Sequence, residues 1–462
     1  MSSPASPDVL EHSPLLKIET TPPDSSVRAE LAYLVRNALP TLLVFQVQFA
    51  LLMAAPLYFA GRQSTAVFSA ASLALTFYYV SGPVVVFGFC TAMDTLCATA
   101  YGARDYTAVG RHYQQCTLVL LAGCVPVGLL WAFPQRALIG VEADLRADAA
   151  AFLRVLVFAA PAVVLFETSK RFLQTQGRYA APTYALLAAL GPALLLHYAG
   201  RNAPLGAAWA LVGTYWLLAA CIAVQLYRHP ECWTPLSWEV LHDVGPLLAL
   251  GGPGIIMVLA ESFAFRVITF LSAQFGEASL AAQTIVTTIS SFSFQLAFSI
   301  GICSSVRLAN YVGQRSQNYL VVVRAASIVA AFLSLSNCLL MLTLRKWLPL
   351  IFTSDPEVIA EARKLFVVVA LNELGDTGNA IFSCLLRGQG RQRVCSVLNL
   401  CAYYILAVPL ELLFAFGMGC GALGLWYGVV IGVCTMAAAE AVLVHRTDWQ
   451  RVLRERWEVA SR

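Results

Sequence analysis

Two short stretches place carboxyl groups inside long apolar runs, where ionisable side chains are rare. The run Leu248–Phe275 contains Glu261 near its middle and Arg266 shortly after it. A charge at the centre of a bilayer costs at least about 2.5–3.5 kcal/mol, so such a residue usually faces a partner or a water-filled cavity. A carboxyl group that meets both water and protein can bind and release a proton. Glu261 is therefore either a proton-carrying group or a structural one, paired with Arg266 or with helix backbone.

The second stretch, Asn372–Asp376, holds the carboxyl groups of Glu373 and Asp376 within the apolar run Leu365–Leu386. Their i, i+3 spacing puts both on one face of a helix. Like charges and a low dielectric both disfavour ionisation, so paired carboxyl groups of this kind can bind protons near neutral pH. The alternative is that Glu373 lies at a bend in contact with water and only Asp376 faces a cavity.

Long membrane-spanning helices must hold these residues in place. The chain of 462 residues is 59% hydrophobic and 12% charged, whereas soluble domains carry about 25% charged residues. In lipid only helices and closed barrels satisfy the backbone, and these runs are continuously apolar rather than alternating, which favours helices. The sequence predicts an all-α membrane protein with twelve transmembrane helices. We expect them at about 30–59, 65–98, 113–138, 148–168, 179–200, 204–227, 243–275, 279–308, 319–350, 357–386, 393–417 and 421–445.

Basic residues gather in the breaks after even-numbered helices, for example at Arg104, Arg315 and Arg391, and in the C-terminal tail. Because loops rich in Lys and Arg stay in the cytosol, both termini are predicted to be cytosolic. An even number of helices agrees with this orientation. Arg345 and Lys346, in the break after the ninth helix, are an exception to the pattern.

The two halves of the chain resemble each other. Ala100–Arg104, after the second helix, matches Tyr311–Arg315 after the eighth, and Gln176–Arg178 matches Gln389–Arg391 at nearly the same offset. Each half holds six helices, so the repeat is parallel, with a pseudo-two-fold axis along the membrane normal, and substrate sites of such folds lie near the midplane between the repeats. We expect an N-terminal bundle at 28–228, a cytosolic linker at 229–242 and a C-terminal bundle at 243–445.

Both ends of the chain are polar. Residues 1–27 are rich in Ser, Pro and acidic residues, which is typical of a disordered cytosolic tail, and they show no signal-peptide pattern. Within them Glu11–Leu16 matches an acidic dileucine motif, which would route the protein to a vacuole or lysosome-like membrane. Residues 446–462 form a charged cytosolic tail that can fold as a short amphipathic helix lying on the membrane.

The break after the second helix carries the most specific motif. Asp94-Thr-Leu followed by Ala100-Tyr-Gly-Ala resembles the signature of eukaryotic multidrug and toxic compound extrusion (MATE) transporters, with Thr99 where that family usually has Gln. Further resemblances follow in the family's order over most of the chain. They are Glu30 with Pro40, Arg171–Gly177, Leu386–Gly390, and Asn399 with Tyr403 and Tyr404 before Pro409.

The resemblance implies a V-shaped pair of bundles and a secondary active antiporter that exports organic cations, drugs or amphipathic metabolites. The coupling ion would be H⁺, with Na⁺ as the alternative, and no other cofactor is expected. The coupling carboxylates of eukaryotic members lie in the C-terminal bundle, which here implicates Glu261 and Asp376, with Glu373 beside them. The first helix holds Gln46 and Gln48 but no acidic residue, which also directs coupling to the C-terminal half.

The resemblance also implies a substrate cavity. We expect it to be lined by Gln283, Arg266, Gln46, Tyr403 and Asn399. Many animal members carry a second Glu at the place of Arg266, so this cation either forms a structural ion pair or favours an anionic or zwitterionic substrate.

Charged residues at the cytosolic ends of the helices suggest a gate. Asp94 is expected to pair with a basic loop residue such as Arg104, and Lys170 and Arg171 are expected to form a second gate cluster with Glu167. Glu411 and Glu440 lie in the last two helices, and nothing in the sequence shows which way they face.

Motifs of other function classes are missing. There is no Gly-Lys-Ser/Thr nucleotide-binding loop, and the 6 His residues form no catalytic or ligand arrangement, so an enzyme is not indicated. The 13 Cys residues include no Cys-x-x-Cys pair, so no metal or disulfide framework is predicted. A net charge of +4 without a basic run predicts no nucleic-acid partner.

Rival interpretations concern the transported molecule. A lipid-linked precursor flippase of the wider superfamily would need a cationic lateral groove, and an exporter of anionic metabolites is a second alternative. A membrane enzyme acting on lipid-linked sugars would need an Asp-x-Asp pattern, which is absent. We expect a monomer in a vacuolar, lysosome-like or plasma membrane, with the lipid bilayer and a small-molecule substrate as its partners.

Overall fold

The computed structural model describes residues 20–134, 142–203, 205–235 and 238–460. Within these ranges, twelve helical segments are long and apolar enough to cross a membrane, as the sequence predicted. The predicted acidic dileucine motif, Glu11–Leu16, lies outside the described residues.

The first six spans belong to the N-terminal bundle. Pro83 starts a new helix within the second span, and the chain turns again at Thr91 and Ala92. The elements are α1 (Val27–Phe49), η2 (Ala50–Ala54), α2 (Ala55–Gly61), α3 (Thr65–Ser81), α4 (Pro83–Cys90), α5 (Met93–Gly102), α6 (Tyr106–Ala132), α7 (Ala143–Leu156), η4 (Val157–Ala159), α8 (Ala160–Thr175), α9 (Ala180–Gly200) and α10 (Gly206–Arg228).

The other six spans form the C-terminal bundle, which follows two short 3₁₀ turns, η5 (Pro230–Cys232) and η6 (Trp238–Leu241). The eleventh span contains two π-helical stretches around Pro409. The elements are α11 (Gly245–Ser272), η7 (Ala273–Phe275), α12 (Glu277–Gly313), α13 (Asn318–Leu344), η8 (Leu348–Ile351), α14 (Pro356–Gly388), α15 (Gln392–Leu400), η9 (Cys401–Ala407), α16 (Val408–Leu412), η10 (Leu413–Gly417), α17 (Gly421–His445) and the terminal helix α18 (Trp449–Ala460).

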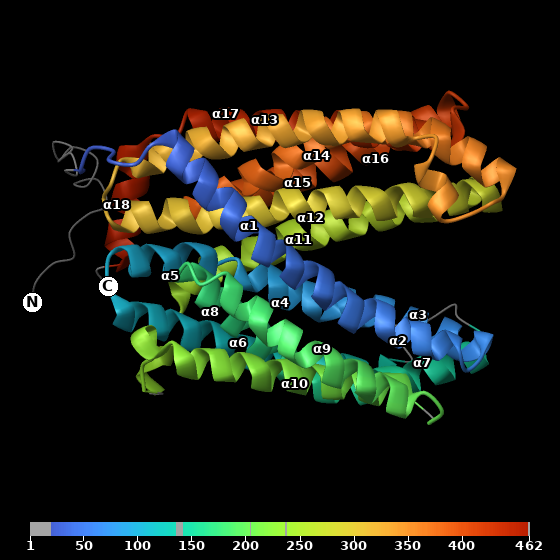
Figure 1. The fold of residues 1–462 in the computed structure, drawn as a ribbon, viewed down its shortest axis with the longest axis horizontal. Helices are drawn as coiled ribbons and strands as arrows, with labels where there is room; N and C mark the ends of the chain where they lie inside the picture. The colour runs from blue at the N-terminus through green and yellow to red at the C-terminus, as the bar shows by residue number, and fades with distance from the viewer. Residues whose placement is uncertain (1–19, 135–141, 204, 236–237, 461–462) are drawn as a thin grey trace, which may run out of the picture.

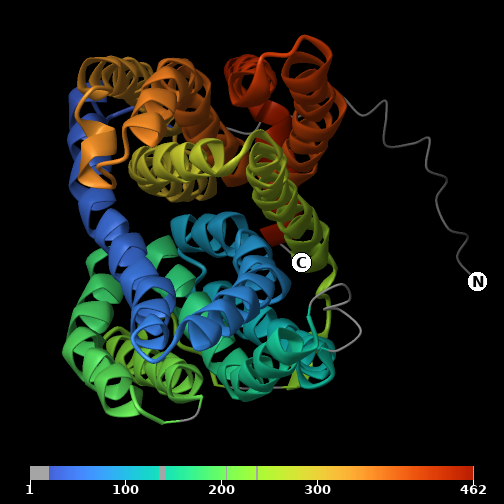
Figure 2. The same cartoon turned by 90° about the vertical axis from the view of Figure 1, so that its right-hand side faces the viewer.

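The two bundles converge at one end and diverge at the other, which confirms the V-shaped fold (Figure 1). We call the converging end, where α1 begins and α18 lies, the base, and the other the open end. Two helices cross between the bundles on opposite flanks: α1 packs against α12 and α13, and α11 packs against α4 (Figure 2). An apolar cluster that includes Leu34 and Ala98 from the first bundle and Val312 from the second seals the base.

The internal repeat predicted from short motifs is visible in the backbone. Arg104 and Arg315 both have positive φ, 63° and 53°, and so do Gly177 and Gly390, at 76° and 75°. Each pair occupies the same place after equivalent helices of the two halves. The positive φ explains glycine at the second pair, because glycine alone adopts such angles without steric cost.

The equivalent helices α5 and α12 cross at the base through glycines. A Cβ atom on Gly102 would lie 2.0 Å from the Asn310 carbonyl oxygen, and one on Gly313 would lie 2.0 Å from the Thr99 carbonyl oxygen. Only residues without a side chain allow the two backbones to approach this closely. The crossing therefore depends on both glycines.

The predicted bounds of the third, fourth and ninth spans differ from the structure by more than five residues at one end or both. The fourth span runs from Ala143 to Thr175 rather than over about 148–168. The third span begins at Tyr106 rather than near residue 113, because the Asp105 side chain accepts a hydrogen bond from the Ala108 amide and caps the helix earlier. The ninth span ends at Leu344 rather than near residue 350, and Pro349 lies in the 3₁₀ turn that follows it.

The polar tails are more ordered than expected in their described parts. Thr21 forms a parallel bridge with Ser316, and Asn318 accepts hydrogen bonds from the amides of Asp24 and Ser25. The tail prediction was therefore wrong for residues 20–26. The amphipathic α18 packs against both α5 and α12, with Leu453 buried, so this face of the helix contacts protein rather than lipid.

Candidate functional site

The central helix of the C-terminal bundle, α14, carries two buried carboxyl groups. Glu373 is 0% and Asp376 3% exposed. The Ser290 hydroxyl on α12 donates to Glu373 Oε1 at 2.7 Å. Within the described chain, Glu373 Oε2 and Asp376 Oδ1 have no hydrogen-bond partner. The i, i+3 spacing therefore does bring both carboxyl groups inside the bundle, and the alternative of a solvated Glu373 is wrong.

Glu261 on α11 belongs to the same electrostatic group. It is half-buried, and its charge acts on Asp376 of α14. The eleventh span holds α11 in place beside it, because Asn399 Nδ2 donates to the Met257 carbonyl at 3.3 Å and the Tyr404 hydroxyl donates to the Ala260 carbonyl at 3.1 Å. We call Glu261, Glu373 and Asp376 the carboxylate cluster.

Tyr403, predicted to line a substrate cavity, lies within electrostatic reach of this cluster. Its side chain is buried and its hydroxyl has no hydrogen-bond partner among the described residues. The charges of Glu261, Asp376 and Glu440 all act on it. Tyr403 therefore marks the place where four helical spans bring polar groups together.

Glu440 on α17 is a fourth acidic residue of this region, and the sequence did not assign it. Its side chain is 0% exposed, and neither carboxyl oxygen has a hydrogen-bond partner in the described chain. The charges of Glu261 on α11 and Arg387 on α14 act on it. The signal was present in the sequence, since Glu440 interrupts an apolar run as Glu261 does, but helix orientation was needed to place it.

No hydrogen bond of the described residues joins Gln283 or Gln46 to the carboxylate cluster. Gln283 is buried on α12, where its Oε1 accepts a hydrogen bond from Trp426 Nε1 at 2.7 Å and its Nε2 has no partner among the described residues. Gln46 is half-buried on α1, in the other bundle. The structure therefore links Gln283 to α17 rather than to the carboxylates.

Arg266 makes no ion pair with Glu261. It is exposed, and no ion pair of the described residues includes it. Five residues of helix rotate the side chain by roughly 140°, so Glu261 and Arg266 do not share a face of α11. Both charges act on Tyr79 of α3 in the opposite bundle. The structural ion pair with Glu261 is thus not formed.

A second buried polar group lies in the N-terminal bundle. Lys170 Nζ lies 2.6 Å from Glu167 Oε2 and donates to Gln48 Oε1 at 3.1 Å, while Gln48 Nε2 donates to Glu167 Oε1 at 2.7 Å. Of the predicted cluster of Glu167, Lys170 and Arg171, the structure joins Glu167 with Lys170, whereas Arg171 pairs elsewhere. Gln48 joins the pair of Glu167 and Lys170, which the sequence did not predict.

Asp94 pairs with Arg171, not with Arg104. Arg171 Nη1 lies 3.2 Å from both carboxylate oxygens of Asp94, and both side chains are fully buried. Arg104 is exposed and follows the end of α5 in the left-handed conformation. Ten residues of helix separate Asp94 from Arg104 by about 15 Å, whereas α8 packs directly on α5. The pairing predicted from the loop was therefore wrong.

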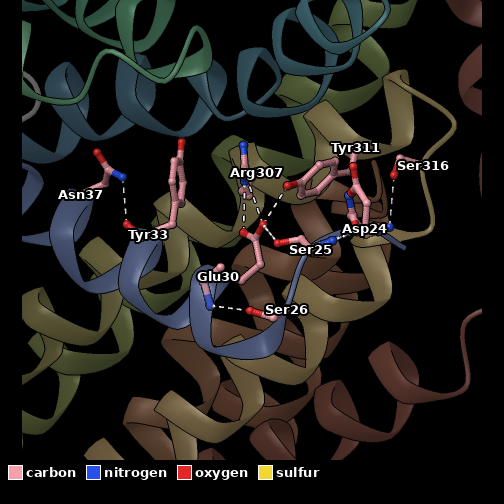
Figure 3. A network of polar contacts seen from close by, with 11 residues as sticks. Asp24, Ser25, Ser26, Glu30, Tyr33, Asn37, Arg307, Tyr311 and Ser316 are labelled. Carbon is pink, nitrogen blue, oxygen red and sulfur yellow. Dashed lines mark hydrogen bonds and ion pairs between the residues drawn. The ribbon is translucent and has the colours of Figure 1, made fainter. Parts of the chain in front are cut away.

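Polar contacts of Thr95 and of Glu30 join the bundles at the base. Thr95 of α5 donates to the Arg387 carbonyl and accepts from Gln392 Nε2 at 2.9 Å. Farther out, Glu30 at the start of α1 accepts from Arg307 Nε and Nη2, each at 3.1 Å, and from the Tyr311 hydroxyl at 2.7 Å (Figure 3). The sequence singled out Glu30 only as a family match and missed its role as an inter-bundle partner.

Metal ligands are not gathered in this site. Among the residues that the structure describes, no group of three or more His, Cys, Asp or Glu could hold a metal ion. None of the ion pairs of the described residues includes a member of the carboxylate cluster, and buried carboxyl groups without a basic partner are groups that can bind a proton.

Twelve candidate spanning helices in two repeated bundles, with ionisable groups buried inside each bundle, are the architecture of many membrane transporters. The MatE family model matches residues 40–199 and 253–413, one match in each half of the chain. The chain therefore belongs to the MATE family, as its motifs indicated.

Similar proteins come from fungi, plants and animals. An uncharacterised transporter of Schizosaccharomyces pombe is 31% identical over 449 residues, which are 94% of this chain and 81% of that protein. Multidrug and toxin extrusion protein 2 of Mus musculus is 27% identical over 92% of this chain and 76% of its own length.

Solved structures agree with the fold. The crystal structure of the eukaryotic MATE transporter AtDTX14 superposes with a TM-score of 0.86 at 25% identity, over 94% of this chain and 100% of that chain. The Vibrio cholerae MATE transporter VcmN, at 17% identity, shares the fold with a TM-score of 0.81 over 93% of this chain and 98% of its own. The protein is thus a multi-pass membrane transporter, and members of its family are transporters rather than enzymes.

Proposed function

We propose that the protein is an antiporter that exports organic cations, drugs or amphipathic metabolites in exchange for protons. The observation that carries the proposal is the carboxylate cluster, Glu261, Glu373 and Asp376, which has no ion-paired basic side chain among the described residues. Charged carboxylates in such surroundings are costly, and binding of a proton removes the charge. Protons from an acidic compartment would reach the cluster through the half-buried Glu261.

Proton binding at the cluster would be linked to the movement of the bundles. Neutral Glu261 and Asp376 no longer repel each other, so α11 and α14 can change how they pack. A ligand shifts a conformational equilibrium only by its different affinity for the two states. Substrate and proton must therefore compete for one state or bind to opposite states.

The direction of export follows from the proposed orientation. With both termini in the cytosol, the base of this structure is the closed cytosolic side. The open end then faces the lumen of a vacuole or lysosome-like compartment, or the exterior at the plasma membrane. Substrate released there would be exchanged for protons from that side.

Transport by the purified full-length protein in sealed vesicles tests the proposal. With an acidic interior, a fluorescent organic cation should accumulate, and a protonophore should abolish the accumulation. Glu261→Gln and Asp376→Asn should each remove gradient-driven uptake, while Glu277→Gln, which changes an exposed carboxylate on α12, should leave it intact. Uptake that requires sodium, or normal proton-driven uptake by Glu261→Gln, would overturn the proposed coupling.

Export of an anionic or zwitterionic metabolite is the second candidate, and Arg266 favours it. This side chain is exposed and lies within electrostatic reach of Tyr79 on the opposite bundle. A cation facing the space between the bundles would attract an anionic substrate and repel a cationic one. In the same vesicles, transport of an anionic dye that disappears in Arg266→Gln would support this candidate, and unchanged cation transport in Arg266→Gln would remove it.

A further inference from the structure

Four basic side chains meet at the open end of the C-terminal bundle. Arg345 and Lys346 follow α13, and Arg363 and Lys364 lie in the second turn of α14. They line a cavity of about 460 Å³ whose other walls are Val367, Val368, Leu423 and Tyr427. Two of the four, Arg345 and Lys346, are the exception to the predicted pattern in which basic residues gather in cytosolic loops. The transport mechanism proposed above makes no use of this cavity.

Local contacts hold the basic side chains around the cavity. Arg363 Nη2 donates to the Lys346 carbonyl at 3.0 Å, which fixes the loop after α13 against α14. One carboxylate is present: Glu361 Oε2 lies 3.1 Å from Lys364 Nζ, in an exposed ion pair. In the described part of the chain no carboxylate pairs with Arg345, Lys346 or Arg363. The cavity is therefore a concave site with an excess of positive charge.

The cavity lies at the level of the membrane interface. With its 33 residues and a rise of 1.5 Å per residue, α14 is about 50 Å long, and the hydrocarbon core of a bilayer is about 30 Å thick. If the extra length of α14 is divided equally between its two ends, about 10 Å of helix projects beyond the hydrocarbon core at each end. Arg363 and Lys364 lie at about this distance from the start of α14. Trp347, 60% exposed, and Tyr427 supply aromatic side chains at the same level, as is typical of the lipid headgroup region.

Apolar side chains continue from the cavity toward the membrane centre. Val367 in the cavity wall is followed along α14 by Leu371 and Leu374, which are exposed and repeat at helical spacing. Ile431, on the adjacent α17, is also exposed. A ligand with a negative headgroup and long apolar chains would fill both the basic cavity and this strip, whereas a free phosphate ion would use only the cavity.

We propose that this cavity binds the phosphate headgroup of an anionic phospholipid in the leaflet at the open end. The two guanidinium groups are suited to phosphate oxygens, which they can bind in pairs, and basic pockets between transmembrane helices recognise anionic headgroups. A bound phosphate offsets the mutual repulsion of the four basic groups. The lipid thereby joins the loop after α13 to α14 and α17. This inference does not depend on proton coupling.

Binding of fluorescent phosphatidylglycerol to the full-length protein in detergent tests the proposal. Phosphatidylcholine, which has the same phosphate but no net charge, is the comparison lipid. Wild-type protein should prefer phosphatidylglycerol at least about tenfold, which corresponds to roughly 1.4 kcal/mol. The double variant Arg345→Gln/Lys346→Gln should lose that preference.

A matched control removes two positive charges elsewhere at the same end. Arg62 and Arg201 each lie over a neighbouring tyrosine ring, Tyr58 and Tyr198, in the N-terminal bundle and line no part of the cavity. Arg62→Gln/Arg201→Gln should keep the preference for phosphatidylglycerol. Thermal unfolding gives a second measurement: added phosphatidylglycerol should raise the unfolding temperature of the wild type and of this control, but not that of Arg345→Gln/Lys346→Gln.

Three results would overturn the proposal. The first is equal binding of the two lipids by the wild type. The second is an undiminished preference in Arg345→Gln/Lys346→Gln. The third is displacement of phosphatidylglycerol by an equal concentration of inorganic phosphate, since this would identify the site as one for a free anion rather than for a lipid.

Discussion

At the scale of single residues, the C-terminal bundle contains several buried carboxyl groups with oxygens that have no hydrogen-bond partner among the described residues. Glu440 is the most isolated of them, because both of its oxygens lack hydrogen bonds within the described residues. The charge of Glu261 repels it, and that of Arg387 attracts it. Glu440 thus belongs to the electrostatic surroundings of the proposed coupling site even though it lies on a different helix.

Replacement of Glu440 by Gln should move the pH dependence of transport. The substitution removes a negative charge near Glu261, so Glu261 gives up its proton more readily and half-maximal transport shifts to lower pH. Transport in vesicles over a pH series measures this shift. Glu411→Gln is the control, since Glu411 is also buried but no charged group is known to act on it; an equal shift in both variants would contradict the argument.

The buried pair Asp94–Arg171 should contribute to stability much more than its exposed neighbour Arg104. Asp94→Asn leaves the fully buried guanidinium group of Arg171 without its counter-charge, and such a loss costs about 3–5 kcal/mol. The unfolding temperature of the purified protein should therefore fall clearly in Asp94→Asn and hardly at all in Arg104→Gln. An equal fall in both variants would instead support the pair of Asp94 with Arg104 that the sequence suggested.

Residue type and helical period predicted which carboxyl groups gather, but not which cations meet them. Glu373 and Asp376 share a face by spacing alone, and the structure brings both inside the bundle. The partner of Asp94 and the exposure of Arg266 depend on how neighbouring helices are rotated, and no local pattern encodes that rotation. Gln48 was missed for the same reason, since its partners lie on the distant α8.

At the scale of elements, the helical spans follow closely from the length of the apolar runs. Nine of the twelve predicted helices agree with the observed spans within five residues at both ends. In two of the three exceptions, a local capping residue or a loop proline sets the end. Periodicity cannot reveal close crossings between helices, because they depend on single glycines. Gly102 and Gly313 lie in the repeated motifs of the sequence, but only the structure shows that the helix crossing depends on them.

Alanine at Gly102 or Gly313 should loosen the base. The new methyl group would lie 2.0 Å from a carbonyl oxygen of the opposite helix, so α5 and α12 must separate. Hydrogen–deuterium exchange at the base ends of both helices should become faster. Gly123→Ala and Gly191→Ala are matched controls, because a Cβ there meets nothing within 4 Å; alanine in a helix interior should even stabilise by up to about 1 kcal/mol. Unchanged exchange in Gly102→Ala would show that the crossing tolerates a side chain.

At the scale of the whole molecule, the repeat predicted two bundles and their axis, and the comparison with AtDTX14 agrees with that architecture. The sequence could not show which end of the molecule is closed in this structure, because the arrangements closed at either end are built from the same helices. The contacts of Glu30 with Arg307 and Tyr311 belong to the closed arrangement of the base. They join the first helix of one bundle to the second helix of the other.

Glu30→Gln should shift the balance of the bundles toward opening of the base. The substitution removes the charge that binds Arg307, so fewer contacts hold α1 on α12. Hydrogen–deuterium exchange of residues 20–33 should rise in Glu30→Gln and in Arg307→Gln alike, and the double variant should add little, because both changes break one interaction. Arg36→Gln, for which no ion pair is found in the described chain, is the control. Fully additive effects of Glu30→Gln and Arg307→Gln would contradict a shared role.

The docking of Asp24 and Ser25 on Asn318 has a consequence for biosynthesis. The ribosome must add 293 residues after Ser25 before Asn318 exists, and at 5–20 residues per second this takes roughly 15–60 s. During that interval the first helix is already made, while the segment before it has no surface to bind. The segment is thus undocked in the nascent chain, and its docking becomes possible only after the first two helices of the second bundle have been made. Protection of residues 20–26 from a protease would therefore report that the second half of the transporter has been assembled.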